Sequence, residues 1–215
     1  MQILSPRLAC LALPLILAGV AKGQTGLANM PIADILKHRE CSFEAAAGGA
    51  EHGDAKRYGY TTALAMGLFD RIEFSGEADY LGSYVGSAKL LLWENPKFLK
   101  NSALSVGFKG LRGKDVDPYV VARFDCKGCR LHGGVWRTGG CVRPMLGSDF
   151  PVVPNVVGTL EYLGGPEGES WTSLTYSPPR LAGFQITLAA GLGHGHEGRS
   201  EGIKNSVTLA YGFKI

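Results

Sequence analysis

The chain has 215 residues, of which 31 are glycine, 19% are charged and 45% are hydrophobic, and its formal net charge is +3. A typical soluble domain has roughly 25% charged residues and about 7% glycine. The glycines follow no three-residue period, which excludes collagen. The hydrophobic content excludes a disordered chain, and the small net charge gives no reason to expect a nucleic-acid partner.

The N-terminus has the features of a cleaved export signal. Arg7 is followed by an apolar run from Leu8 to Val20 and then by small residues. A charged start, an apolar stretch and a small-residue cleavage site, in this order, are typical of a secretory signal peptide. The run is too short to span a bilayer. We expect residues 1–23 to form the signal peptide, with cleavage after Ala21 or Gly23.

Two alternatives concern the same run. A lipoprotein anchor at Cys10 is excluded because this cysteine lies at the start of the apolar run rather than after it. A buried N-terminal helix is disfavoured by Pro14, which interrupts the middle of the run. The protein is therefore predicted to be exported.

Residues 24–38 are predicted to form a periplasmic segment, a coil or a short helix, with Pro31 suited to the first helical position. Beyond it, apolar and polar residues alternate with the period of two that is typical of β-strands, as in residues 71–80. The alternation predicts about 12 strands, within a range of 10–14, at Glu40–Gly48, Arg57–Met66, Arg71–Tyr80, Gly86–Trp93, Ala103–Lys109, Tyr119–Asp125, Arg130–Thr138, Arg143–Phe150, Val156–Leu163, Trp171–Ser177, Gly183–Leu192 and Ser206–Ile215.

Residues 39–215 are predicted to form an all-β fold, a closed antiparallel transmembrane β-barrel, monomeric and with both termini on the periplasmic side. Predicted connections are short after four of the strands, as at Pro178–Arg180, and longer after others, as at Gly110–Asp117 and Gly193–Asn205. Short turns at one rim and long loops at the other are typical of outer-membrane barrels. A sheet in lipid must close, since an open edge leaves backbone groups without partners. The alternative is a soluble exported β-barrel or sandwich that acts as a binding protein.

The end of the chain resembles the C-terminal assembly signal of outer-membrane barrels. Thr208, Ala210, Phe213 and Ile215 supply a polar position, a small one and two hydrophobic ones. Alanine replaces the usual glycine, and isoleucine replaces the commonest terminal residue, an aromatic. The resemblance implies the barrel-assembly machinery as a partner.

The alternation also places charged side chains on the lumen face of the predicted barrel. Acidic residues of the first three strands face basic residues of the fourth to seventh strands across the bore. The predicted lumen-lining charges are Glu40, Glu44, Glu73, Glu77, Asp79, Lys89, Lys109, Arg123, Arg130 and Glu161. They fit two functions, a network of ion pairs that closes the barrel or a water-filled pore. Twelve strands leave a lumen wider than in packed eight-stranded barrels and narrower than in sixteen-stranded porins.

Cys126-Lys127-Gly128-Cys129 has the C-x-x-C spacing of zinc sites, redox pairs and haem attachment. Arg130 follows where haem attachment needs histidine, and Cys141 would lie about 30 Å away at the opposite rim, too far to complete a zinc site. Two interpretations of the motif remain: a disulfide between Cys126 and Cys129 across a hairpin turn, or two free thiols. Cys41 and Cys141 are expected to be unpaired, and no metal or cofactor is predicted.

An enzymatic function has little support in the sequence. His194 and His196 lie in a predicted loop, where a solvated segment is favoured over a metal site. Outer-membrane lipid-modifying enzymes such as lipid A deacylases use a His–Ser pair, and His38, His52 and His132 have no evident serine partner. We therefore predict that the protein is not an enzyme and assign no catalytic residue.

Three segments resemble one family of bacterial outer-membrane barrels. Gly26–Asp34 is similar to the G-L-x-N-M-P-T-A-x opening of that family, Asp117–Ala122 to its D-P-Y-V-V-A-S strand, and Leu160–Gly165 to its M-A-D-Y-I-G-G strand end. The family is related to the YjbH-like barrels encoded with exopolysaccharide-secretion genes. The resemblance implies an outer-membrane barrel and brings no settled activity. From the divided lumen we expect a passive pore or an envelope-structural protein, and the gene context of the relatives suggests a link to polysaccharide export. The partners expected are outer-membrane lipid and either polysaccharide or small polar solutes.

Overall fold

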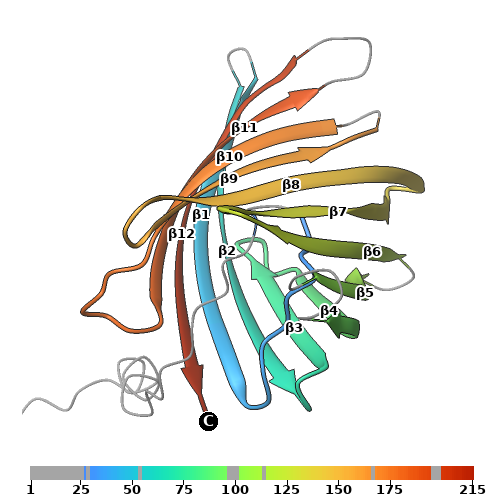
Figure 1. Ribbon diagram of the computed structural model, residues 1–215. Helices are drawn as coiled ribbons and strands as arrows, with labels where there is room; N and C mark the ends of the chain where they lie inside the picture. Colours follow the sequence, from blue (N-terminus) through green and yellow to red (C-terminus); the bar gives the residue numbers. More distant parts are fainter. Residues whose placement is uncertain are drawn as a thin grey trace, which may run out of the picture.

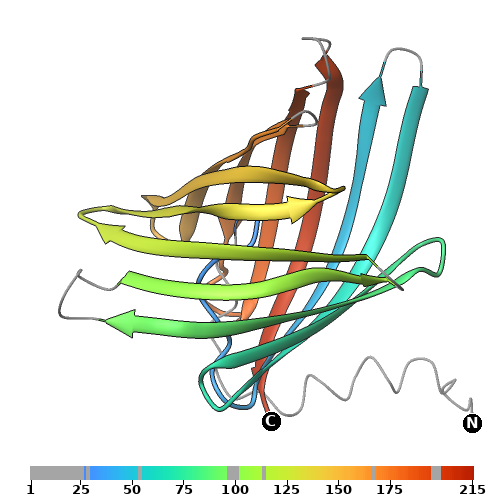
Figure 2. The ribbon, with the colours of Figure 1, turned by 90° about the vertical axis from the view of Figure 1, so that its right-hand side faces the viewer.

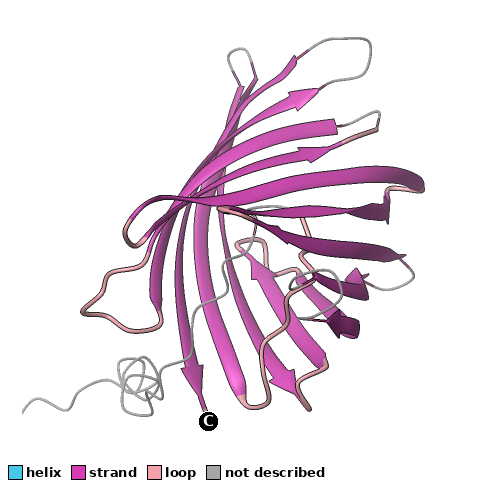
Figure 3. Ribbon diagram, in the orientation of Figure 1, coloured by secondary structure: helices cyan, strands magenta, loops and turns pink. Residues whose placement is uncertain are grey.

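The computed structural model describes residues 27, 30–52, 55–95, 102–112, 115–165, 168–194 and 200–215. Strands make up almost all of this part of the chain (Figure 3). They are β1 (Glu40–His52), β2 (Ala55–Leu68), β3 (Ile72–Asp79), β4 (Tyr84–Asn95), β5 (Ser102–Arg112), β6 (Asp115–Cys126), β7 (Cys129–Thr138), β8 (Cys141–Val153), β9 (Val156–Leu163), β10 (Gly168–Tyr176), β11 (Phe184–His194) and β12 (Ser200–Lys214). No helix in the described residues is long and apolar enough to cross a membrane.

The twelve strands form one closed antiparallel barrel (Figures 1 and 2). Each strand pairs with its neighbours in the sequence, and the last strand pairs with the first, from Glu40 opposite Lys214 to Glu51 opposite Ile203. Closure gives both edges of the sheet a partner, as backbone groups in lipid require. The predicted closed antiparallel barrel is therefore confirmed, and every predicted strand corresponds to one of the twelve observed strands.

The predicted difference in loop length between the two rims is wrong. β5 continues to Arg112, and β6 begins at Asp115 inside the predicted loop, while β11 and β12 together occupy much of residues 193–205. Backbone pairing does not depend on side-chain alternation, so the ladder continues into glycine-rich and polar residues where the period of two is lost. The predicted tight turn at Pro178–Arg180 lies in a longer connection, because proline cannot donate a hydrogen bond to the ladder.

The outer face of the barrel is apolar. Strands around the whole barrel expose large apolar side chains, among them Phe43, Leu64, Phe74, Leu90, Val120, Leu131, Leu146, Leu160, Leu174, Leu188 and Leu209. Exposed aromatic residues lie towards the two rims. Phe69, Trp93, Phe124 and Tyr176 are near the rim where β1 begins and β12 ends, called here the terminal rim, and Tyr58, Tyr84 and Tyr162 are near the opposite rim. An apolar band between two aromatic girdles is the outer surface of a membrane barrel.

The residues that precede β1 lie inside the barrel. Leu27, Met30, Ile32 and Ala33 are buried against lumen-facing side chains of the strands. Residues 27 and 30–38, which belong to the predicted periplasmic segment 24–38, thus lie in the lumen and not outside the barrel, and residues 30–37 form no helix, which agrees with the coil alternative of the prediction. The physical reason is that the apolar side chains of this segment are removed from water when they pack in the lumen. We call residues 27 and 30–38 the lumen segment; residues 1–23, the predicted signal peptide, lie outside the described part of the chain.

Candidate functional site in the barrel lumen

The lumen segment packs on one wall of the barrel. Its apolar side chains form a cluster with Leu91, Ala103, Tyr119, Val121 and Met145, which point inward from β4, β5, β6 and β8. Val121 and Met145 are fully buried. A barrel of twelve strands has an interior wider than the eight-stranded one that strand side chains can fill. The lumen segment fills part of this interior. Its contact explains why the inner faces of β4–β8 carry apolar side chains.

Strand side chains bind the backbone of the lumen segment. The amide of Met30 donates to Oε2 of Glu161 at 3.1 Å, and the amide of Leu36 donates to Oε2 of Glu73 at 2.8 Å. Oγ of Ser105 donates to the carbonyl oxygen of Ala33 at 2.7 Å, and Nζ of Lys89 donates to that of Asp34. An irregular segment has no ladder to satisfy its backbone groups. These side chains replace the ladder and hold the segment in one position.

Asp34 is the charged centre of this contact. Its carboxylate accepts from the guanidinium groups of Arg123 and Arg130, the latter at 2.9 Å between Nη1 and Oδ2. Arg130 also binds Asp149, with 2.8 Å between Nε and Oδ1, and Nε2 of His132 lies 2.9 Å from Oδ2 of Asp149. Two arginines and two aspartates thus offset one another inside the barrel, as buried charges require.

The lumen segment leaves the lumen at the terminal rim. The amide of His38 donates to Oδ1 of Asp70 at 2.8 Å, and the His38 ring stacks on Phe69 with 5.8 Å between centroids. The amide of Lys37 donates to Oε2 of Glu40 at 2.9 Å. Glu40 was predicted to line the lumen, but its carboxylate binds the turn that leads into β1.

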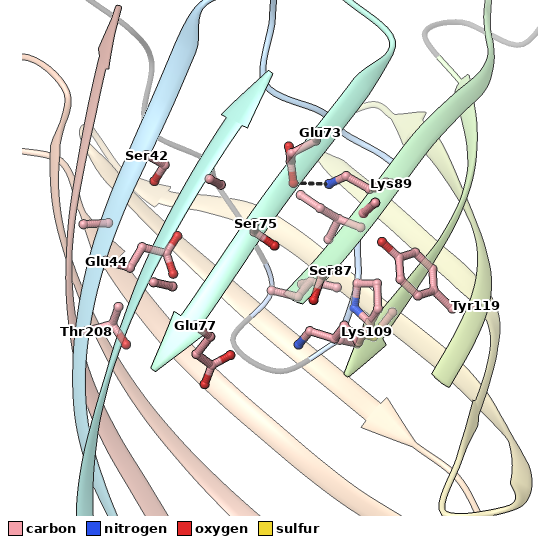
Figure 4. A pocket seen from close by; sticks show the side chains of 18 of the residues that line it. Ser42, Glu44, Glu73, Ser75, Glu77, Ser87, Lys89, Lys109, Tyr119 and Thr208 are labelled. Carbon is pink, nitrogen blue, oxygen red and sulfur yellow. Dashed lines mark ion pairs between the residues drawn. The ribbon is translucent and has the colours of Figure 1, made fainter. Parts of the chain in front are cut away.

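Two adjoining cavities, which share part of their lining, lie beside the lumen segment. The first, of about 240 Å³, extends from the lumen segment along the inner faces of β1, β2, β3 and β12. The second, of about 540 Å³, continues along β1, β2 and β12 towards the opposite rim. Both are lined by Glu44, Ala63, Glu77, Lys109 and Thr208, which we call the junction. Figure 4 shows Glu44, Glu77 and Lys109 pointing into the first cavity from three different strands.

The charges that the sequence places in the lumen fall into three groups. Glu44, Glu77 and Lys109 lie at the junction. Glu73 and Lys89 form an ion pair of 3.1 Å beside the first cavity, and Asp79 lines the second cavity while its Oδ1 accepts the amides of Leu81 and Ser83 at 2.9 Å. Arg123, Arg130 and Glu161 bind the lumen segment.

Sequence reasoning missed several residues of the lumen. Asp149, Lys204 and Trp171 face inward by the same alternation that located Glu77, so the parity of their strands could have found them. Lys204 pairs with Glu169, whose Oε2 also accepts from the indole nitrogen of Trp171 at 2.7 Å. Asp34 had no such signal, because it lies in a segment without a period.

The C-x-x-C residues flank a two-residue turn. Cys126 and Cys129 are directly opposite each other in the ladder, and Gly128 between them has a positive φ of 88°. Opposite residues in an antiparallel pair have Cα atoms about 4.5–5.5 Å apart, within the range for a disulfide. Both are free thiols here, as are Cys41 and Cys141. Within the described residues no three His, Cys, Asp or Glu side chains gather as a metal site.

The structure also locates parts of the C-terminal pattern and some of the histidines that the sequence analysis considered. Thr208 and Ala210 of the C-terminal pattern line the first cavity, Ile215 is exposed, and recognition by the assembly machinery stays a prediction. His196 lies outside the described residues, and so do the side chains of His52 and His194. His132 is buried in the lumen network rather than on the outer wall.

Comparison with known proteins gives structural matches only. Neither protein-family models nor curated proteins match the sequence. The barrel is similar to the KdgM porin, with a TM-score of 0.56 and 10% identity over 79% of this chain and 98% of that one. It is also similar to the NanC porin, with a TM-score of 0.54 and 13% identity over 80% of this chain and 100% of that one.

A third structural match is an outer membrane channel from Pseudomonas putida F1. The TM-score is 0.53 and the identity 11%, over 88% of this chain and 100% of that one. At these identities the matches establish the fold, a porin-like barrel. The resemblance to exopolysaccharide-associated barrels gains no support from them.

Proposed function

We propose that the protein is an outer-membrane pore that lets small polar solutes diffuse through a bore narrowed by its own N-terminal segment. The observation that carries this proposal is the pair of cavities that meet at the junction. They extend along one wall of the lumen, while the lumen segment fills the other wall. The fold shared with porins and with an outer membrane channel supports the same function.

The outer surface supports a location in the outer membrane. A soluble barrel or sandwich would present polar residues to water, whereas this one exposes an apolar band between two aromatic girdles. The terminal rim faces the periplasm in this proposal, because exported single-chain barrels keep both termini there.

The proposal does not include an enzymatic activity or polysaccharide export. The structural neighbours are porins or channels, which gives no support for an enzyme. Polysaccharide export rests on the sequence resemblance of three segments alone. The two cavities have volumes of the order of small-molecule binding pockets.

Conductance tests the proposal. The mature protein would be refolded in detergent, checked for β-structure and inserted into a planar bilayer. We expect steady, salt-dependent single-channel currents, smaller than those of a sixteen-stranded porin measured in parallel. Folded, inserted protein that conducts no ions would contradict a pore and favour an envelope-structural role.

A further inference from the structure

The junction joins the two cavities, so a solute that passes from one to the other must pass its side chains. Ala63 and Thr208 are small and uncharged, and the chemistry of the junction therefore comes from Glu44, Glu77 and Lys109. Glu77 is exposed although it faces the lumen, which means that water reaches its carboxylate. Two carboxylates and one ammonium group meet the solute there.

The other lumen charges are offset by close partners. Lys89 is paired with Glu73, and Lys204 with Glu169. The arginines of the opposite wall are offset by Asp34 and Asp149 of the lumen segment and β8. The basic side chains that the sequence predicts on this wall are thus offset by Asp34 of the lumen segment and by carboxylates of β3, β6 and β8, whereas Glu44 of β1 and Glu77 of β3 stay in contact with the cavities.

Lys109 offsets part of this negative charge. Its Nζ lies 5.5 Å from the centre of the Trp136 ring, a cation–π contact that holds the ammonium group on the β5–β7 side of the bore. The junction therefore has an acidic side on β1 and β3 and a single base across from it. Its formal charge is one negative unit, with the two carboxylates on the same side.

We propose that the junction selects small solutes that carry an ammonium group, zwitterions included, over anions. This inference rests on the proposed pore function and names its solute class. The ammonium group of the solute passes along Glu44 and Glu77, and the carboxylate of a zwitterion passes along Lys109. Narrow, low-dielectric walls focus the field of such charges, and acidic side chains give cation selectivity in other channels.

The experiment measures reversal potentials of the refolded mature protein in a potassium chloride gradient, and then with ethanolamine hydrochloride replacing potassium chloride on one side. The wild type is expected to prefer potassium over chloride and to conduct ethanolammonium. Glu44→Gln and Glu77→Gln should each lower the cation-to-anion permeability ratio by roughly two- to fivefold. Lys109→Gln should raise it, which gives a test in the opposite direction if either glutamine variant fails to fold.

Glu40→Gln is the matched control. Glu40 lies on the same strand as Glu44 but binds the turn at Lys37 and lines neither cavity, and a glutamine oxygen can still accept that bond. Its permeability ratio should equal that of the wild type. A conducting channel that prefers chloride, or whose ratio is unchanged by all three junction variants, would overturn the inference while the pore function stands. Folded protein without conductance would overturn both.

Discussion

Asp34 and Arg123 form an ion pair inside the barrel, although 88 residues lie between them in the sequence and Asp34 belongs to no strand. Asp34 lies in the lumen segment, which precedes β1 in the sequence, and Arg123 points inward from β6. The pair fixes the lumen segment against the wall opposite the cavities. The side of the bore that stays open is therefore decided by residues that do not line it.

Replacing Asp34 with alanine should detach the lumen segment. The change removes a carboxylate shared by two guanidinium groups, which keep Asp125 and Asp149 as partners, so the free energy of unfolding in urea should fall by roughly 1–3 kcal/mol. The released segment should also raise and destabilise the single-channel current. Asp117→Ala, on the same strand as Arg123, removes an acceptor for the hydroxyl of Thr138 and serves as the control. Equal currents and stability in both variants would contradict the anchoring role of Asp34.

Gly67 is predicted to be essential for the exit of the lumen segment. A Cβ atom there would lie 2.2 Å from the carbonyl oxygen of Leu36 and 2.3 Å from that of Lys37, so a larger side chain must displace the backbone. Gly67→Val should lower the free energy of unfolding by roughly 1–3 kcal/mol and make trypsin cleavage after Lys37 faster. Gly76→Val is the control, because no atom lies within 4 Å of its Cβ position. Resistance of the Gly67 variant equal to that of the control would show that the segment is not held there.

The lipid-facing surface is tested by two adjacent residues of β11. Leu188 is exposed on the outer face, whereas Thr187 lines the first cavity. Leu188→Arg should destabilise the barrel by roughly 2–4 kcal/mol in lipid vesicles, the range for arginine near the bilayer midplane. Thr187→Arg should cost less and reduce cation permeability. Urea titrations in vesicles measure the first effect, and an unchanged stability of the Leu188 variant would favour a soluble protein.

Cation preference should decline as salt concentration rises. The Debye length shortens from about 10 Å at 0.1 M to about 3 Å at 1 M, so the charges of Glu44 and Glu77 are screened from passing ions. Reversal potentials across a fixed concentration ratio, recorded at both mean concentrations, measure this decline. A preference independent of salt would indicate selection by pore size instead of charge.

Cys126 and Cys129 are expected to form a disulfide after export into an oxidising compartment. They face each other across the Lys127–Gly128 turn, so little movement is needed. Peptide mass mapping of a non-reduced digest should find them joined, while Cys41 and Cys141 stay alkylatable after unfolding. A bridge from Cys41 or Cys141 to any other cysteine would contradict the observed topology.

The alternation of residues was sufficient to predict the barrel and the direction of its side chains. Glu44 and Glu77 face the cavities as the period of two implies, because a strand side chain has only two directions to choose from. The lumen segment could not be predicted in this way. Residues 30–38 have no period, and the contact of Asp34 with Arg123 and Arg130 depends on a fold that brings the N-terminal segment to the distant β6–β7 hairpin. The charges left facing the cavities depend on that contact, so they too could not be read from parity alone.

The position of the lumen segment also constrains the order of assembly. Its partners lie on β3–β9, while the strand that follows it, β1, must pair with β12 to close the ring. A segment that joins directly to the closing strand and binds the middle of the sheet brings the two ends of a curved sheet towards each other. We expect the middle strands to fold around the N-terminus first, so that the ring closes on a segment already in place.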